Sequence, residues 1–314
     1  MVFIARKKAG KETYYYLAHN LRSERGKWKS LREYVGKKMP GKAKLQKLTE
    51  SFIQKHCIQI KKKYAYIDPE RLSKLDFVIG EFQKKVKGYP RIVIEKRERD
   101  FTIRFTYNTN AIEGNTVSLI ETAAMLEKKV MPAGRSLREI HEIFNTELAL
   151  NFIRTCKAGI SKRLILRIHK MMMANIDDAE GGRIRNYPVA IEGANWMPPS
   201  EKEVEGKFDE FLAWYSKSKR KLHPIELAAI AHLKFIEVHP FGDGNGRVAR
   251  LMTNLVLMRN GYPPINIKVR DTIPYVKGLQ YAQNTQEFKK LVDWFVQKLG
   301  EEYAESAKRG AAQG

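Results

Sequence analysis

Apolar side chains recur at helical spacing along most of the chain after residue 68. Each of these stretches places apolar residues at positions i, i+3 and i+4, which predicts amphipathic helices. The stretches lie at 136–155, 161–176, 199–217, 224–238, 246–260 and 286–306. A further helix is expected to start at the Asp-Pro pair of residues 68–69. The pattern therefore predicts a mainly α-helical fold.

Residues 2–36 follow a different pattern. The runs 13–22 and 27–36 are rich in aromatic and β-branched residues, and Ser-Glu-Arg-Gly separates them. This pattern predicts a small antiparallel hairpin or a three-stranded sheet. Residues 37–44, which include a Pro-Gly pair, are expected to form a linker. The chain thus begins with a β-containing segment ahead of the helices.

A shorter alternation lies inside the helical part. Tyr187, Val189 and Ile191 alternate with other residues, and Gly193 and Asn195 then turn the chain. This pattern predicts an exposed β-hairpin. An exposed strand edge can pair with an extended peptide of any sequence. An ordinary structural hairpin is the alternative.

The composition is that of a globular protein and excludes several classes. Of the 314 residues, 43% are hydrophobic and 30% are charged, as is usual for a folded chain. No apolar run approaches the ~18 residues that span a membrane, and no signal-peptide pattern opens the chain. Cys57 and Cys156 lie far apart without metal-ligand spacing. We therefore expect inert thiols in a reducing cytoplasm.

The net charge of +23 is concentrated near the N-terminus. Residues 1–100 contain 27 lysines and arginines but only 11 acidic residues. Such an excess attracts nucleic acid, nucleotides or acidic proteins, although it also fits a Lys-rich bias of the source organism. Tyr14, Tyr15 and Tyr16 could stack on bases, but packing on a sheet face is their commoner use. Because no recognised nucleic-acid-binding motif accompanies the charge, nucleic-acid binding is an alternative rather than the favoured function.

Residues 239–250, His-Pro-Phe-Gly-Asp-Gly-Asn-Gly-Arg-Val-Ala-Arg, carry the most specific chemistry. His239 can accept or donate a proton near neutral pH. Pro240 predicts that the preceding helix ends at this point. Asp243 supplies the hard oxygen ligand that suits Mg²⁺. A proton acceptor and a metal ligand therefore lie four residues apart.

The second half of this stretch predicts a phosphate site. Gly244 and Gly246 allow backbone turns that aim successive N–H groups at an anion, and Asn245 adds a side-chain donor. A helix follows directly, and a helix N-terminus favours phosphate. Arg247 and Arg250 lie three residues apart, on one face of that helix.

Each of these features alone is more often structural. At His223-Pro224, for example, no glycine loop, acid or arginine follows, and we interpret that pair as a helix start. The combination of all the features, in this order and directly before a helix, predicts a catalytic loop instead.

The stretch resembles the signature of the Fic family, which is His-Pro-Phe, any residue, Asp or Glu, Gly-Asn-Gly-Arg, two variable residues and Arg. Every fixed position of that signature is matched here. The likeness extends over about residues 95–300. Residues 223–238 resemble the family's central helix, 181–200 its flap, 109–114 its inhibitory motif and 274–284 its adenine-side helix.

The resemblance implies a protein adenylyltransferase, in which a Ser, Thr or Tyr hydroxyl attacks the α-phosphate of ATP. His239 would accept the hydroxyl proton, and Asp243 would hold Mg²⁺ or Mn²⁺. The Gly244–Gly246 amides and Asn245 would stabilise charge on the phosphoryl oxygens. Arg247 would contact the β-phosphate, and Arg250 the γ-phosphate.

The resemblance also implies residues for the adenine and for the target. Tyr275, Gln283 and Asn284 are candidates for the adenine pocket, although Gln283 stands where we expect Asn. Tyr187, Val189 and Ile191 would belong to a flap that holds the target segment beside the catalytic loop.

A second motif implies autoinhibition. The family's inhibitory pattern is Ser or Thr, three residues, Glu, then Gly or Asn, and Thr109, Glu113 and Gly114 match it. A surface carboxylate near a helix end is the structural alternative. The matching neighbours and the availability of Arg250 favour an ion pair between Glu113 and Arg250, which would occupy the partner of the γ-phosphate. In some family members the same Glu assists removal of AMP, and the sequence leaves this open.

The expected architecture is mainly α, a Fic-type helical bundle with a β-hairpin flap after a small β-containing segment. The expected segments are a basic part at 1–65, a helical Fic region with the inhibitory motif at 66–130, the catalytic core at 131–300 and a tail at 301–314. Expected partners are ATP and a hydroxyl-bearing target protein, in the cytoplasm and without a membrane. Several alternatives remain open. They are self-modification, a homodimer, removal of AMP, another nucleotidyl or phosphoryl transfer, and a regulator with a silent Fic core.

Overall fold

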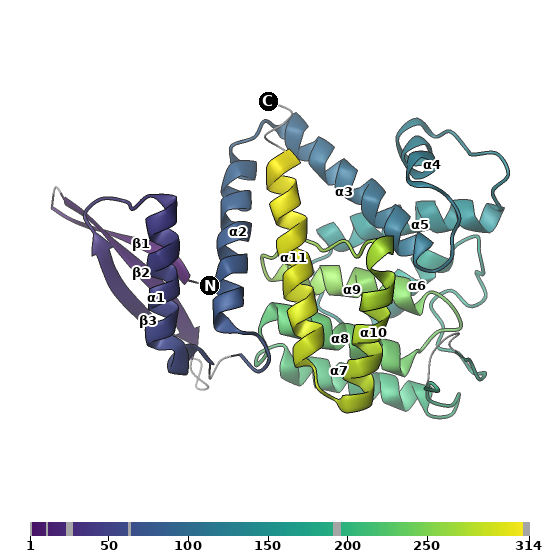
Figure 1. The fold of residues 1–314 in the computed structure, drawn as a ribbon. Coiled ribbons are helices and arrows are strands. Elements are labelled where there is room, and N and C mark those ends of the chain that lie inside the picture. Colours follow the sequence, from purple (N-terminus) through teal and green to yellow (C-terminus); the bar gives the residue numbers. More distant parts are fainter. Residues whose placement is uncertain (1, 11, 23–27, 62–63, 191–195, 310–314) are drawn as a thin grey trace. The chain divides into compact units, whose positions relative to one another are not determined.

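The computed structural model describes residues 2–10, 12–22, 28–61, 64–190 and 196–309 (Figure 1). The chain forms two compact units. Unit 1 comprises Met1–Lys87 and Leu299–Gly314, and unit 2 comprises Gly88–Lys298. These units divide the chain at other places than the expected boundaries at residues 66, 131 and 301. The four-segment division therefore stays a prediction.

Unit 1 begins with a three-stranded antiparallel sheet, which confirms the pattern of residues 2–36. Strands β1 (Val2–Ala9), β2 (Glu12–Arg22) and β3 (Trp28–Gly36) lie in the order β1-β2-β3. Leu17 is opposite Ile4 on one side and Glu33 on the other. A β-bulge between Tyr15 and Tyr16 shifts the register of β2 against β3.

Helix α1 (Lys42–Lys61) packs beside this sheet, and the sequence pattern did not predict it. It contributes the fully buried Phe52, and His56 lies 3.1 Å from the Glu33 carboxylate of β3. The expected linker at 37–44 is shorter than predicted because α1 already begins at Lys42. Many lysines and glutamines interrupt the apolar spacing of this helix, so packing on the sheet stabilises it more than its own pattern.

The rest of unit 1 is helical. Helix α2 (Pro69–Lys87) begins where Asp68 accepts hydrogen bonds from the Glu70 and Arg71 amides. Phe82 of α2 packs edge-on against Tyr303 of α11 (Lys289–Arg309), with ring centroids 4.9 Å apart. Residues 301–309 therefore continue helix α11, in which Tyr303 is buried, and the expected tail at 301–314 begins within that helix.

Unit 2 is a helical assembly (Figure 1) built around α8 (Pro224–Val238). Helix α8 is almost entirely buried. Helix α8 packs against α7, α9 and α10, and α5 packs against α3, α6 and α9. The other elements are α3 (Arg91–Ala111), α4 (Leu119–Ala123), the π-helical turn η1 (Ala124–Lys128), α5 (Leu137–Thr155), α6 (Lys162–Met173), α7 (Val204–Ser218), α9 (Asn245–Arg259), the 3₁₀ turn η2 (Val269–Asp271) and α10 (Thr272–Thr285). The mainly helical fold is thus confirmed. None of the helices in the described ranges is long and apolar enough to cross a membrane.

Helix starts in unit 2 follow local capping chemistry. Ser136 caps α5 and Ser118 caps α4, each in a capping box with a Glu three residues later. His223 caps α8 with Glu226 in the same way, which confirms His223-Pro224 as a helix start. These caps fix where the buried faces of the helices begin.

The expected β-hairpin at 181–200 has no strand in its described residues. Residues 181–190 and 196–200 form turns and extended segments. Ile191, Gly193 and Asn195 lie outside the described residues, so the hairpin itself stays a prediction.

Three histidines in unit 2 have a lowered pKa, and one of them, His239, is only half-buried. His169 is 1% exposed and His232 is fully buried. Burial lowers the pKa of His169 and of His239 to about 4, and that of His232 to about 3. All three imidazoles are therefore neutral at pH 7.

Replacing a buried residue of α5 tests the packing of unit 2. Leu150 is fully buried, whereas Leu148 on the same helix is 57% exposed. Leu150→Ala should lower the free energy of unfolding by about 2–5 kcal/mol because it leaves a cavity. Leu148→Ala should change it by less than about 0.5 kcal/mol. Chemical denaturation measures both, and similar losses in the two variants would contradict the packing.

The buried histidines predict a loss of stability with mild acid. Unfolded histidine titrates near pH ~6.5, so between that pH and about 4 the unfolded chain binds more protons than the folded one. The free energy of unfolding should therefore be highest above pH 6.5 and fall as the pH drops. Carboxylates such as Glu139, with a pKa lowered from 4.5 to about 2, lose their contribution only at lower pH. Urea denaturation at pH 7, 6 and 5 measures the effect, and equal values would refute it.

Candidate active site

The loop between α8 and α9 has the geometry that its sequence predicts. His239 ends α8 in the left-handed region (φ 46°), and its N–H donates to the Phe235 carbonyl at 3.1 Å. Gly244 (φ 78°) precedes α9, which starts at Asn245. A left-handed backbone is uncommon for a residue with a side chain and often marks a functional site. The first amides of α9 have no acceptor within the helix and face the loop side.

Asn245 shapes the loop with its side chain. Its Oδ1 accepts the Phe241 N–H at 3.0 Å, and its Nδ2 donates to the Phe241 carbonyl at 2.8 Å. The whole residue, backbone included, is 2% exposed. The expectation of a free side-chain donor for phosphate is therefore not met, because the amide closes the loop instead. Its backbone N–H remains part of the helix N-terminus.

His169 of α6 braces the loop from the other side, and the sequence interpretation missed it. Its ring stacks on Phe241 with centroids 3.7 Å apart and planes at 7°. The Gly182 N–H donates to Nδ1 at 3.0 Å, so Nε2 carries the proton and donates to the Asp243 carbonyl at 3.1 Å. One imidazole thus joins the start of segment 181–200 to the loop.

The imidazole of His239 is mostly shielded from solvent. Burial lowers its pKa to about 4, although the Ile236 carbonyl and the carboxylates of Glu113 and Asp243 act in the opposite direction. Its imidazole is therefore neutral, and a neutral imidazole can take the proton of a hydroxyl.

Arg185 ties segment 181–200 to His239. Its guanidinium is buried and donates to three backbone carbonyls, those of His239 (2.9 Å), Tyr187 (3.0 Å) and Pro199 (2.5 Å). The Arg185 N–H also donates to the Pro240 carbonyl at 3.0 Å. Nothing in the local sequence distinguishes this arginine from a surface one, so it escaped the sequence interpretation.

Tyr187 packs over the loop. A Cβ added to Gly242 would lie 1.9 Å from the Tyr187 hydroxyl, so the phenol fills the space that a side chain would need. The hydroxyl donates to Glu180 at 2.8 Å, and burial together with this bond raises the pKa of Tyr187 to about 12. Val189 is half-buried nearby in sequence, and Ile191 lies outside the described residues.

Glu113 meets Arg250, as the sequence predicts. The Arg250 Nη2 donates to the Glu113 Oε1 at 2.7 Å, and Nε donates to the Thr109 hydroxyl at 2.6 Å. Burial alone would lower the pKa of Arg250, but Glu113 raises it above its ordinary value. A Cβ on Gly246 would lie only 2.4 Å from Glu113 Oε1. The carboxylate therefore lies directly over the first turn of α9.

Glu113 is itself held by the turn that follows α3. The N–H of Glu113 donates to the Asn110 carbonyl at 3.0 Å, and Gly114 takes a left-handed conformation (φ 92°). Asn115 then donates from Nδ2 to Glu142 at 2.8 Å and to the Glu139 carbonyl at 3.1 Å. The turn is thus fastened to α5.

Arg247 and Asp243 lie in one chain of charges. Buried Arg247 is 3.0 Å from Asp243 Oδ1 and 3.0 Å from Glu142 Oε1. Arg138 contacts the other oxygen of Asp243. Burial alone would raise the pKa of Asp243, but Arg247 and the Gly244 amide keep it below its ordinary value. The guanidinium of Arg247, which the resemblance assigns to the β-phosphate, is therefore paired with two carboxylates.

The residues at the loop fit a divalent cation that arrives with phosphates. Mg²⁺ in nucleotide sites uses one or two protein carboxylates and completes its shell with phosphate and water. Asp243 is an ionised carboxylate at the rim of the loop, 38% exposed. In the parts of the chain that the structure describes, no three His, Cys, Asp or Glu side chains gather as an all-protein metal cluster.

The structure brings together only part of the expected adenine set. Tyr275 is 3% exposed, and its hydroxyl lies 2.6 Å from His232 Nε2 and bonds Arg250. Its hydroxyl is therefore engaged with His232 and Arg250, and its place beside adenine stays a prediction. Gln283 is half-buried and Asn284 is exposed near the end of α10. Their adenine role stays a prediction.

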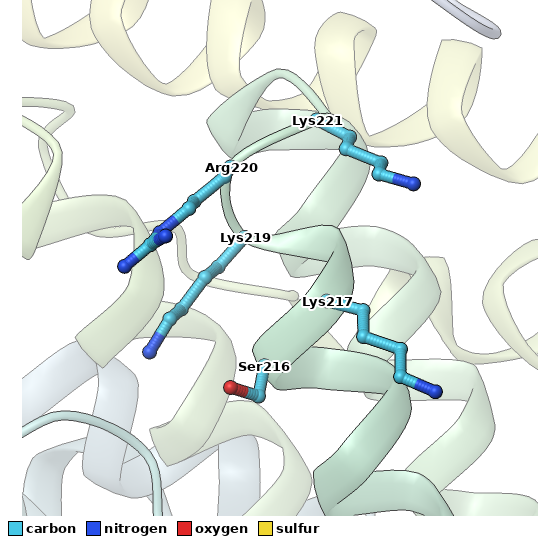
Figure 2. Close-up of a pocket in the computed structure, with 5 residues that line it drawn as sticks. All are labelled: Ser216, Lys217, Lys219, Arg220 and Lys221. Carbon is cyan, nitrogen blue, oxygen red and sulfur yellow. The ribbon is translucent and has the colours of Figure 1, made fainter. Parts of the chain in front are cut away.

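A cavity of about 410 Å³ lies away from this loop (Figure 2). It is lined by Ser216, Lys217, Lys219, Arg220 and Lys221. Figure 2 shows Lys219 and Arg220 pointing to one side and Lys217 and Lys221 to the other. The cations do not converge on one point, so this cavity lacks the geometry of the catalytic loop.

Comparison with known sequences agrees with the family resemblance of the loop at residues 239–250. The Fic/DOC family matches residues 159–257. The protein adenylyltransferase Fic of Nematostella vectensis is 33% identical over 229 residues, which are 71% of this chain and 52% of that protein. The protein adenylyltransferase fic-1 of Caenorhabditis elegans is 37% identical over 195 residues, 60% of this chain and 38% of that protein. The chain thus spans about half, or less, of the length of these relatives.

Solved structures share the fold. A fragment of Fic-1 from Caenorhabditis elegans matches with a TM-score of 0.65 at 30% identity, covering 85% of this chain and 76% of that one. A Fic domain containing signaling protein from Bacteroides thetaiotaomicron matches with a TM-score of 0.70 at 23% identity, covering 77% and 99%. The complete loop signature, the helices around it and these likenesses lead to one conclusion: the chain belongs to the Fic family.

Proposed function

We propose that this chain is a protein adenylyltransferase that its own Glu113 holds inactive. The observation that carries the proposal is the Glu113 carboxylate, 2.7 Å from Arg250 and directly over Gly246. A helix N-terminus and a buried arginine are a site for a phosphate group, and here a carboxylate stands in for it. The names of the relatives from Nematostella vectensis and Caenorhabditis elegans support the same activity.

In the proposed reaction, a target hydroxyl forms a bond to the α-phosphorus of ATP. Neutral His239 takes the hydroxyl proton, and the bond from the α-phosphorus to the bridging oxygen breaks, so that pyrophosphate leaves. The α9 amides stabilise negative charge on the phosphoryl oxygens. Asp243 would hold Mg²⁺ or Mn²⁺, and the bound cation would neutralise phosphate charge.

The two arginines have different starting positions. Arg250 becomes available to a γ-phosphate when Glu113 leaves, because Glu113 is its carboxylate partner. Arg247 forms ion pairs with Asp243 and Glu142. It would have to give up one of these ion pairs to contact a β-phosphate. Planar guanidinium groups suit both contacts. Inhibition therefore acts on the orientation of ATP, with Glu113 repelling the γ-phosphate.

The target segment would lie along Tyr187, Val189 and Ile191, and Arg185 fastens the first of these beside His239. Backbone pairing there would accept an extended peptide of varied sequence. A protein with a Ser, Thr or Tyr hydroxyl is the proposed partner, and the chain itself is one candidate. A cytoplasmic location fits ATP as the substrate and stays part of the proposal.

Removing the proposed base should abolish transfer. His239→Ala in a Glu113→Gly background should lower incorporation of AMP from α-labelled ATP by at least ~100-fold, because general base catalysis contributes about 10²–10⁴. The matched control is His141→Ala in the same background, since His141 lies on α5 outside the loop. Undiminished labelling in the His239 variant would show that another group accepts the proton.

Removing the inhibitory carboxylate should raise activity. Glu113→Gly should increase initial AMP incorporation about tenfold or more, which corresponds to ~1.4 kcal/mol or more of relieved inhibition. Glu113→Gln keeps the bulk but loses the charge, so its rate of AMP incorporation should lie between those of the unaltered chain and Glu113→Gly. Exposed Glu127→Gln should leave the rate unchanged. Mass spectrometry of the protein and of a lysate identifies the group and the modified residue, and an unchanged rate in Glu113→Gly would exclude autoinhibition by this residue.

A further inference from the structure

One face of the N-terminal sheet carries aromatic and basic side chains. Antiparallel pairing sets Lys7 opposite Tyr14, Ala5 opposite Tyr16, and Tyr16 opposite Tyr34. Because directly opposed residues project to the same side of a sheet, these side chains share one face. We call it the aromatic face, and its members are Phe3, Lys7, Tyr14, Tyr16, Arg32 and Tyr34.

The core of unit 1 lies on the opposite face. Leu17 and Leu31 project to that side and are 3% and 7% exposed. Helix α1 covers it, with Phe52 fully buried and His56 bonded to Glu33. Apart from Ala18, which is fully buried on the aromatic face, the buried apolar residues of the sheet thus lie on the face that α1 covers.

Two of the aromatic residues on this face are open to solvent, whereas Tyr14 and Tyr16 are half-buried. Tyr34 is 56% exposed and Phe3 is 38% exposed. The Tyr34 ring lies 5.5 Å from Tyr16 and 6.2 Å from Tyr14, tilted by 59° and 47°. Three phenol rings thus form a continuous surface, with Tyr34 as its most accessible member.

The charge around these rings is positive. Lys7 and Arg32 are exposed, and neither has a carboxylate partner in the described part of the chain. Glu12 lies at the end of the same face, but Lys37 neutralises it at 2.6 Å. The first hundred residues add a large basic excess, 27 basic against 11 acidic residues.

We propose that the aromatic face binds single-stranded nucleic acid. Unpaired bases stack on tyrosine rings regardless of sequence, and neighbouring lysine and arginine contact the phosphates. The bases of a duplex are stacked on one another and unavailable to a ring surface, which favours a single strand. An acidic peptide would use the cations but would leave three phenol rings without a partner. Tyr34 supplies the stacking surface, and Lys7 and Arg32 supply the phosphate contacts.

Binding by the full-length chain tests this proposal. The probes are a fluorescein-labelled 20-nucleotide single strand of mixed sequence and the duplex of the same sequence, measured by fluorescence anisotropy at 50 and 200 mM salt. The single strand should bind more tightly than the duplex. Tyr34→Ala should weaken binding about tenfold, in the range that loss of one base–aromatic stack produces, whereas Tyr34→Phe should bind like the unaltered chain.

Charge removal gives an independent measurement. Lys7→Gln with Arg32→Gln should reduce the slope of log affinity against log salt by about 1.4, since each single-strand phosphate contact contributes ~0.7. Lys217→Gln with Lys219→Gln removes two charges from α7 and the turn that follows it, and serves as the matched control. His239→Ala should bind normally, so the result is independent of the transferase.

Several results would overturn the proposal. These are no binding of the single strand at 50 mM salt, tighter binding of the duplex, or unaltered binding by Tyr34→Ala with an unaltered thermal transition. Equal losses in the two charge-removal pairs would show that binding depends on net charge alone, and would also overturn it.

Discussion

The start of α9 needs an anion, and much of unit 2 follows from that need. The first amides of a helix have no acceptors within the helix and carry partial positive charge. Arg250 adds a full positive charge at the same place while being 3% exposed. A buried guanidinium is costly unless it is paired, so the chain supplies Glu113 from the end of α3. The same requirement that would suit the loop to a phosphate therefore makes it a site for a carboxylate of the protein itself.

The loop keeps its shape through contacts to its backbone. Asn245 closes it onto Phe241, His169 holds the Asp243 carbonyl, and Arg185 holds the His239 carbonyl. Each of these buried groups satisfies carbonyls or amides that would otherwise be costly to leave unpaired. Asn245, His169 and Arg185 thus maintain the backbone of the loop, whereas Arg247 and Arg250 are held by carboxylates.

Much of the site could be predicted from the sequence because its order along the chain carries the chemistry. The loop at 239–250 and the helices on both sides of it follow from local patterns, and the Glu113–Arg250 contact was expected from the resemblance to the Fic family. His169 and Arg185 could not be predicted, because each acts on the backbone of a distant segment and that leaves no spacing in the sequence. Tyr275 was expected near adenine, but its hydroxyl bonds His232 across the helical core. Helix α1 escaped because its stability depends on the sheet beneath it.

The contact of Tyr187 with Gly242 links two positions that are 55 residues apart in the chain. The phenol occupies the volume that any larger residue at 242 would fill, so the two positions cannot enlarge independently. Among descendants of a common ancestor, a substitution that adds a side chain at one position should be accepted only with a smaller residue, or a displaced backbone, at the other. Position 242 is the variable place within the family signature. The size of its residue in each relative should therefore indicate how closely segment 181–200 can approach the loop.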